Sequence, residues 1–240
     1  MIRSTGALPA AAGPSGGQAS RPSFGGHWHR ALEDLGLRVC VETDLEAWTA
    51  FIRATEWPVV NAVIDPAYHD FTTGEACWLR LSRGETTVAT QVLRSIVTDD
   101  YVGMVRDHSL FFGSHSSGFR DFRMLAGERI PKIGGSVAHL SGLYIRPAWR
   151  RVRTADGLRL VAAWTRLTHS FTTRALGADW SVSLIEGRVA TRRLIADLYG
   201  YPNWSELFEA YEPALGRFER VTLVWMSAVE LAESVASRPR

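Results

Sequence analysis

Apolar and polar residues alternate along several short stretches of this 240-residue chain, and this two-residue period predicts strands. The stretches are residues 37–42, 76–81, 87–96, 137–145, 179–186 and 220–226. A Ser-Arg-Gly-Glu turn joins the second stretch to the third and predicts a β-hairpin. The fourth stretch is rich in branched apolar side chains but contains Gly142, which indicates a bulge or the close approach of another group.

Helices are predicted in the segments between these strands. Four of them cover residues 44–57, 58–70, 99–112 and 188–199. A fifth, central helix has its apolar positions at Leu160, Val161, Trp164, Leu167 and Phe171. The first is capped by Thr43 or Asp44 and ends at Pro58. This central helix forms a crossover between strands 137–145 and 179–186, so these two strands are expected to be parallel neighbours. The chain is therefore predicted to be an α/β protein.

A basic segment leads from strand 137–145 into the central helix. Pro147 ends the strand because it has no N–H to donate to the sheet. Three arginines follow, namely Arg150, Arg151 and Arg153. Thr154 or Asp156 is then expected to cap the helix. A helix N-terminus offers unpaired N–H groups and a partial positive charge, so this turn is predicted to bind an anion.

The run HLSGLYIRPAWRRVRTA, residues 139–155, resembles the fourth strand and following turn of the GNAT superfamily, the acyl-CoA-dependent N-acetyltransferases. In that family an Arg/Gln-x-x-Gly-x-Gly/Ala turn wraps the pyrophosphate of coenzyme A. The matching residues here are Arg150, Arg151, Val152, Arg153, Thr154 and Ala155. Arg150 and Ala155 fit the pattern, whereas Arg153 replaces the first glycine and loses the freedom that glycine has at positive φ.

The order of elements over residues 37–227 also matches that family, and Tyr199-Gly200-Tyr201 resembles its Leu-Gly-Phe-like turn. The resemblance implies a mixed, mostly antiparallel sheet that is flanked by helices and splayed at a central parallel strand pair. It further implies that an acetyl group passes from acetyl-CoA to a primary amine by direct attack, without a metal. The expected partner is therefore a small-molecule or protein amine.

Two residues are expected to move protons in that reaction. His139 stands where histone-acetylating members of the superfamily carry a Glu, and a neutral imidazole can accept a proton from the amine near neutral pH. The other interpretation is a histidine satisfied by hydrogen bonds within the sheet. Tyr199 is the candidate general acid, although Ala196 occupies the usual tyrosine position of the family. The strand edge that would pair with the pantetheine arm consists of Leu143, Tyr144 and Ile145.

Two alternatives stay open. The family's Asn early in helix 188–199 is missing, and Val189 or Arg192 stands in its place. A longer acyl-CoA, or an acyl carrier protein, would be a donor consistent with the substituted glycine. A non-catalytic domain that binds acyl-CoA or a protein partner would be consistent with the missing Tyr and Asn.

Composition and charge narrow the class further. The formal net charge is only +2 and no nucleic-acid motif is found, which argues against a nucleic-acid partner. Cys40 and Cys77 lie in apolar stretches, so a reducing cytoplasm is expected. The sequence contains no run of 18 apolar residues, so no membrane span is predicted. His27-Trp28-His29 has no acid or cysteine beside it, so no metal site is expected, and a homodimer is left open.

The chain is expected to hold one domain. Residues 1–27 are dominated by Gly, Ala, Ser and Pro and contain no acid, which predicts a flexible tail. Residues 28–240 then form a single acyltransferase-like domain. Residues 98–135 are expected to be an insertion between the third and fourth strands, and insertions near a site often shape substrate choice.

Overall fold

The computed structural model describes residues 26–56, 58–72, 74–113, 119, 121–125, 130–187, 190–191, 194–212 and 216–236. Within them, one eight-stranded sheet has the order β1-β2-β3-β5-β6-β8-β7-β4. The strands are β1 (Arg38–Glu42), β2 (Ala76–Arg83), β3 (Thr86–Thr98), β4 (Arg123–Met124), β5 (Gly135–Ile145), β6 (Trp180–Glu186), β7 (Asn203–Glu212) and β8 (Arg217–Ser227). Neighbouring strands are antiparallel except for the parallel pair β5 and β6. The expected α/β class with a mixed, mostly antiparallel sheet is confirmed.

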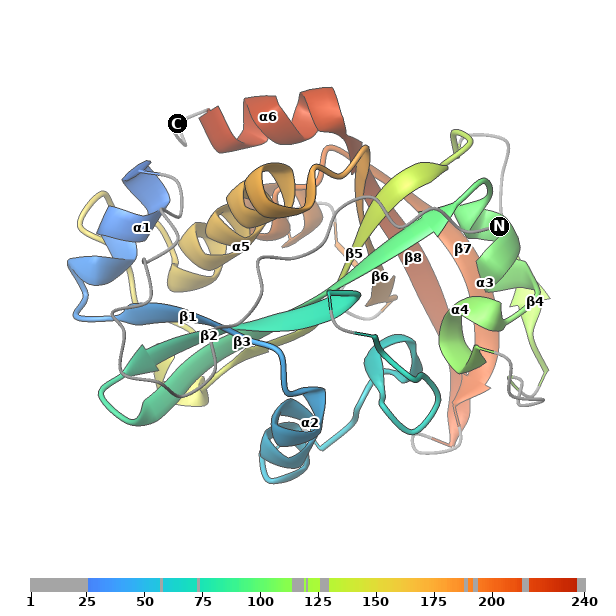
Figure 1. Cartoon of the computed structure of the whole chain (residues 1–240), viewed down its shortest axis with the longest axis horizontal. Coiled ribbons are helices and arrows are strands. Elements are labelled where there is room, and N and C mark those ends of the chain that lie inside the picture. The colour runs from blue at the N-terminus through green and yellow to red at the C-terminus, as the bar shows by residue number, and fades with distance from the viewer. Residues whose placement is uncertain are drawn as a thin grey trace.

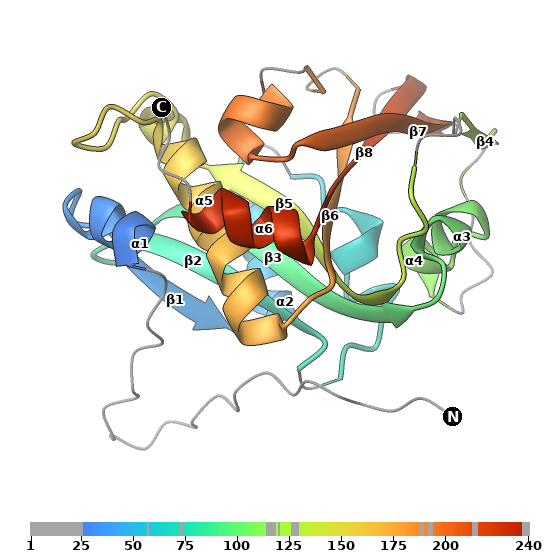
Figure 2. The same ribbon diagram turned by 90° about the horizontal axis from the view of Figure 1, so that it is seen from above.

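Helices cover both faces of this sheet (Figure 1). On one face lie α1 (Gly26–Glu33), α5 (Leu160–Phe171) and α6 (Ala228–Ala236), and Figure 2 shows α5 and α6 from above, crossing the strands. On the other face lie α2 (Leu45–Arg53), the 3-10 turn η1 (Ala62–Ile64), α3 (Tyr101–Arg106) and α4 (Ser109–Phe112). The remaining turns are η2 (Pro147–Trp149), η3 (Thr172–Leu176) and η4 (Leu194–Tyr199). No helix in the described ranges is long and apolar enough to cross a membrane.

The parallel pair separates partway along its length. β5 and β6 are in register from Val137 with Trp180 to His139 with Val182. Beyond that point residues 140–145 of β5 stay with β3, while residues 183–186 of β6 stay with β8. The expected splay at the central parallel pair is therefore confirmed, and it begins directly after His139.

Gly142 creates the bulge that the sequence predicts in this strand. Its φ is +60°, and the register between β3 and β5 shifts beside it. A Cβ at this position would collide with the Trp48 ring of α2 and lie 3.1 Å from Cδ1 of Ile64. Trp48 Nε1 donates to Thr90 Oγ1 at 3.3 Å, and Thr90 Oγ1 donates to the Gly142 carbonyl at 3.2 Å. Only glycine lets α2 approach the bulge this closely.

The prediction of a helix over residues 58–70 is wrong, because only the short turn η1 forms there. The Asn61 side chain accepts from the Val63 N–H at 2.9 Å and starts this turn. Asp65 ends it with ψ of 120°. The next residue is Pro66, and the residue before a proline is disfavoured in helical geometry.

The helix predicted over residues 99–112 is divided in two. Asp100 caps α3 by accepting from the Gly103 N–H at 2.8 Å. His108 then adopts a φ of +68°, which interrupts the helix before α4 begins. The helix predicted over 188–199 is found only as the π-helical turn η4, and residues 188, 189, 192 and 193 lie outside the described residues.

Two helices and two strands of the described residues were not predicted, namely α1, α6, β4 and β7. α1 begins at Gly26, so its first two residues fall in the segment expected to be a tail. Trp28 and Leu32 of this helix are buried against α5 and the sheet. The rest of that expected tail lies outside the described residues.

Candidate active site

The edge of β5 opens where β6 leaves it. The Arg146 N–H donates to the Val88 carbonyl of β3 at 2.8 Å, so this backbone group points toward β3. Because these directions alternate along a strand, the backbone groups of Leu143 and Ile145 point away from β3, toward the split. Arg150 Nε donates to the Ile145 carbonyl at 2.9 Å. The N–H groups of Leu143 and Ile145 thus remain without a strand partner in the described part of the sheet.

Tyr144, the third residue of the predicted edge, has a different place. Its backbone pairs with Thr90 of β3. Its ring packs edge-on against Phe51 of α2, with a centroid distance of 5.6 Å, and its hydroxyl donates to Glu56 at 3.3 Å. Tyr144 therefore forms the α2 side of the split rather than its open edge.

Three arginines gather just beyond the end of β5. Arg151, Arg153 and Arg159 line an open hollow of about 440 Å³. The loop between them is closed by two backbone bonds, from Thr154 N–H to the Leu158 carbonyl at 2.8 Å and from Leu160 N–H to the Val152 carbonyl at 2.9 Å. Arg153 and Arg159 face each other between these bonds, so their own N–H groups point outward. Outward N–H groups and three positive charges favour an anionic ligand.

The six residues predicted to bind the pyrophosphate do not act as one group. Arg150 turns away from the hollow and pairs with Glu56 at 2.6 Å. Val152 packs against the apolar core below α1 and α5, and Thr154 is buried with its hydroxyl donating to Asp156. Ala155 is exposed. Arg151 and Arg153 are the members whose side chains line the hollow.

The predicted start of the central helix is also wrong. α5 begins at Leu160, and its N-cap residue Arg159 provides no side-chain cap. The expected caps serve the loop instead, because Asp156 accepts from Thr154 and lies 3.2 Å from His27 Nε2 of α1. Arg159 was missed as a residue that lines the hollow for this reason. The Asp156-Gly157 pair, with Gly157 at a φ of +82°, is the turn signal that could have placed the loop.

His139 lies at the point where the parallel pair separates, and its side chain is completely buried. The Tyr101 hydroxyl lies 2.6 Å from Nδ1 of His139. Nε2 has no hydrogen-bond partner among the described residues. Burial and, secondly, the positive charge of Arg94 lower the pKa of His139 to about 3, so the ring is neutral at physiological pH. The usual imidazole pKa that the sequence suggested does not apply here.

Tyr101 and Arg94 were not singled out from the sequence. Tyr101 comes from α3, and burial raises the pKa of its phenol well above the ordinary value. Arg94 is the register partner of His139 on β3. No local pattern marks either residue, because both meet His139 only through strand pairing and the docking of α3.

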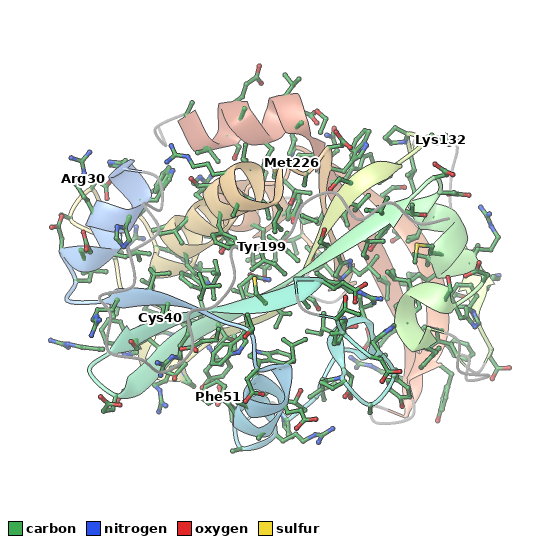
Figure 3. The ribbon with its side chains drawn as sticks, viewed as in Figure 1. Arg30, Cys40, Phe51, Lys132, Tyr199 and Met226 are labelled. Carbon is green, nitrogen blue, oxygen red and sulfur yellow. The ribbon has the colours of Figure 1, made fainter. Side chains whose placement is uncertain are left out.

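Tyr199 does not join this cluster. It belongs to a separate apolar cluster on the α5 side of the sheet, with Ile195 and Tyr201, and its carbonyl lies 2.9 Å from Nε2 of His169. Figure 3 shows Tyr199 on that side and Phe51 on the other. Burial raises the pKa of the Tyr199 phenol. The structure therefore does not bring the two predicted catalytic residues together.

The described residues contain no group of three or more His, Cys, Asp or Glu side chains arranged to hold a metal ion. Cys40 and Cys77 are free thiols. Cys77 is buried, and this burial raises the pKa of its thiol to about 12. It is therefore a poor nucleophile at neutral pH.

No protein-family model and no curated protein sequence matches the chain. Similar solved structures include an aminoglycoside N(6′)-acetyltransferase from Legionella pneumophila, with 9% identity, a TM-score of 0.44, and coverage of 82% of this chain and 95% of that one. An N-acyl amino acid synthase from uncultured soil microbes has 9% identity, a TM-score of 0.45, and coverage of 84% and 96%. A polyamine N-acetyltransferase of Drosophila melanogaster has 13% identity, a TM-score of 0.41, and coverage of 79% and 100%.

Proposed function

We propose that the chain is an N-acyltransferase that moves an acetyl group from acetyl-CoA to a primary amine. One observation carries this proposal: the open edge of β5 runs from the split at His139 directly to the hollow lined by Arg151, Arg153 and Arg159. A long, mostly neutral arm with a phosphate-bearing end fits such a path. Coenzyme A has this chemistry.

The pantetheine arm would pair with the open edge as an added strand does. Its amide groups would bond to the free N–H groups and carbonyl of Leu143 and to the N–H of Ile145. The phosphates would lie against Arg151, Arg153 and Arg159 and the outward N–H groups between them. Arg150, held by Glu56, would position the end of β5 through the Ile145 carbonyl.

The reaction would be direct. The amine nitrogen attacks the thioester carbonyl carbon, a C–N bond forms, the C–S bond breaks, and the thiolate leaves and takes up a proton. A free N–H of the β5 edge would donate to the developing oxyanion. An acyl-enzyme on Cys77 is disfavoured because its thiol is buried and stays protonated.

His139 would accept the proton that the amine loses. The tautomer with its proton on Nδ1 donates to the Tyr101 oxygen and leaves the Nε2 lone pair available. Because the pKa of His139 is about 3, the imidazolium would form only briefly and pass its proton on, directly or through water. Tyr199 stays a proposed acid without a contact to this group.

A second candidate function is a non-catalytic domain that binds acyl-CoA. The complete burial of His139 and its separation from Tyr199 favour this alternative. The open edge and the arginine hollow would then serve binding alone. The donor itself, acetyl-CoA, a longer acyl-CoA or an acyl carrier protein, is distinguished by the same experiment.

The experiment is a turnover assay with acyl-CoAs of increasing chain length, the same acyl groups on an acyl carrier protein, and a panel of amines. Free thiol release and the N-acyl product are both measured, and native mass spectrometry identifies any acyl-CoA that copurifies. Amine-dependent thiol release with a matching product supports transfer. Tight acyl-CoA binding without release, for every amine, supports the binding domain and overturns the enzyme.

A further inference from the structure

Arg94 is a half-buried positive charge that lacks a close counter-ion. Among the described residues no carboxylate oxygen lies within 4.0 Å of the Arg94 guanidinium, the distance that defines an ion pair. The negative charge of Glu75 acts on Arg94 only from a greater distance. Nη1 instead donates to the carbonyls of Val63 at 2.8 Å and Leu110 at 3.1 Å. The guanidinium also lies 5.3 Å from the centre of the Phe71 ring. A charge withdrawn from water is costly unless it is paired, so this site is suited to an anion.

One edge of this guanidinium has the donor geometry that a carboxylate needs. Nη1 contacts the two carbonyls and, at 3.3 Å, Nε2 of His69. The contact of Nη2 is Nδ1 of His69 at 3.3 Å. Nε has no acceptor in the described part of the chain. The edge formed by Nε and Nη2 can donate two parallel hydrogen bonds, and carboxylates accept such a pair.

Arg94 also lies beside the proposed reaction centre. It is the register partner of His139, so both side chains project from the same face of the sheet. Nε2 of His139 is fully buried and has no partner among the described residues. Two polar groups next to the split are therefore left incompletely satisfied, which is typical of a site that a substrate completes.

The arginine hollow for the phosphates lies at the other end of the same edge. From His139 to Ile145 a strand spans roughly 20 Å, at about 3.3 Å per residue. An anion at Arg94 would thus not compete with the phosphates at Arg151, Arg153 and Arg159. The two anion sites would hold different molecules from opposite ends of the split.

We propose that Arg94 binds a carboxylate of the acceptor, so that the substrates are amines that also carry a carboxylate, such as amino acids. This inference rests on the proposed acyl transfer. With its carboxylate on the Nε and Nη2 edge, the acceptor places its amine toward His139 and the open edge of β5. The same anion offsets the positive charge that Arg94 sets beside His139.

A purely structural role for Arg94 makes a different prediction. Its bonds to Val63 and Leu110 join η1 to α4, so the side chain could simply hold these segments together. Loss of these bonds would lower the stability of the fold and would reduce kcat/KM for every acceptor to the same extent. The two roles are separated by acceptors that differ only in the carboxylate.

The test uses the full chain, acetyl-CoA, and the proteinogenic amino acids, each paired with the amine that decarboxylation gives. Arg94→Met and Arg94→Lys are compared with wild type, and Arg94→Lys keeps a cation but not the fork. The control is Arg166→Met. Arg166 is also half-buried, bonded to the carbonyls of Ala162 and Asp197, and placed 5.8 Å from the centre of the Trp28 ring, but on the α5 side of the sheet.

We expect at least one amino acid to exceed its paired amine tenfold or more in kcat/KM. Arg94→Met should lower kcat/KM for that amino acid at least tenfold and change the paired amine less than threefold. The kcat/KM of Arg94→Lys for that amino acid should lie between the values of wild type and Arg94→Met. Arg166→Met should leave the ratio of kcat/KM between the amino acid and its paired amine unchanged. An equal loss for both compounds, or a wild-type preference for the amines, overturns the inference.

Failure of the proposed function would look different. If no compound is acylated, the N-acetyl amino acids and the matching N-acetyl amines are titrated calorimetrically against wild type and both Arg94 variants. Binding that requires the carboxylate and is lost in Arg94→Met or Arg94→Lys upholds the site without the reaction. Binding that is equal for both compounds, or absent for all, overturns the site as well.

Discussion

The Tyr101 oxygen lies 2.6 Å from Nδ1 of His139, and both side chains are completely buried. This contact joins α3, in the predicted insertion, to β5 at the point where the parallel pair separates. Among the described residues it is the hydrogen bond that orients the imidazole, since Nε2 has no partner. The bond on one ring nitrogen sets the tautomer and thereby decides what the other nitrogen can do.

Tyr101→Phe should therefore affect both stability and catalysis. The change leaves Nδ1 of His139 buried without a partner, which should cost about 1–3 kcal/mol of unfolding free energy. Since Tyr101 no longer selects the tautomer, kcat should fall by roughly tenfold or more, while KM for acetyl-CoA stays unchanged. Urea unfolding and initial rates on one preparation measure both effects.

Tyr201→Phe is the matched control. Tyr201 is also buried, and its hydroxyl lies 3.3 Å from Ser181 Oγ on the α5 side of the sheet. This variant should lose stability but keep kcat per folded molecule. If both variants keep kcat, the contact between Tyr101 and His139 has only a structural role.

The stability of the fold should depend on pH through His139. Burial holds its pKa near 3, whereas in the unfolded chain it returns to the ordinary 6.5. Between these values the unfolded state binds more protons, so stability is lost as the pH falls from about 7 toward 3. From pH 7 to pH 5 this one group should cost about 2 kcal/mol.

His139→Gln removes that contribution. Its amide N–H can still donate to the Tyr101 oxygen, and the fall in unfolding free energy between pH 7 and pH 5 should be smaller by about 2 kcal/mol. His169, which burial also holds at a pKa of about 4, stays intact in both proteins. An equal fall in wild type and variant, or a wild-type rate inflection near pH 6.5 that the variant lacks, would show that His139 titrates normally.

The pattern of short apolar stretches was sufficient to predict six of the eight strands that the described residues form. The strands over residues 37–42, 76–81, 87–96, 137–145, 179–186 and 220–226 all form, because each alternates or runs apolar over a length typical of strands. β7 was missed because its glutamates recur at every third residue in NWSELFEAYE, which breaks the two-residue alternation typical of a strand. It is a strand because β8 pairs with it along its length, and such pairing is not readable from one segment alone.

The site was predictable only where its residues are close in sequence. Gly142 and the basic turn could be recognised because a strand glycine and an arginine cluster are local signals. Arg94 and Tyr101 reach His139 through strand register and helix docking, which no local pattern encodes. Glu56 pairs with Arg150 across a long sequence separation, so no local pattern could predict that Arg150 turns away from the hollow.

Gly142→Ala should destabilise the fold by about 2–5 kcal/mol. A residue with a Cβ is strained at a φ of +60°, and here the Cβ also collides with the Trp48 ring. Gly157→Ala is the control, because its φ is +82° but nothing lies within 4 Å of the added Cβ. That variant should lose only about 1–2 kcal/mol by urea unfolding. Equal losses would mean that the contact with Trp48 relaxes without cost.

Arg159→Met should weaken the binding of coenzyme A by about 1.5–3 kcal/mol, the range for a hydrogen bond to a charged group. Arg159 lines the hollow at the start of α5, so its expected ligand is a phosphate. S-acetylpantetheine has no phosphate, and its binding should be the same in variant and wild type. Arg220→Met, which changes an exposed arginine paired with Glu206 on β7, should alter the affinity for neither ligand.

Calorimetry at two salt concentrations measures these affinities, and the loss for coenzyme A should shrink at high salt because screening weakens exposed charges. If Arg159→Met weakens S-acetylpantetheine as much as coenzyme A, the hollow is not where the phosphates bind.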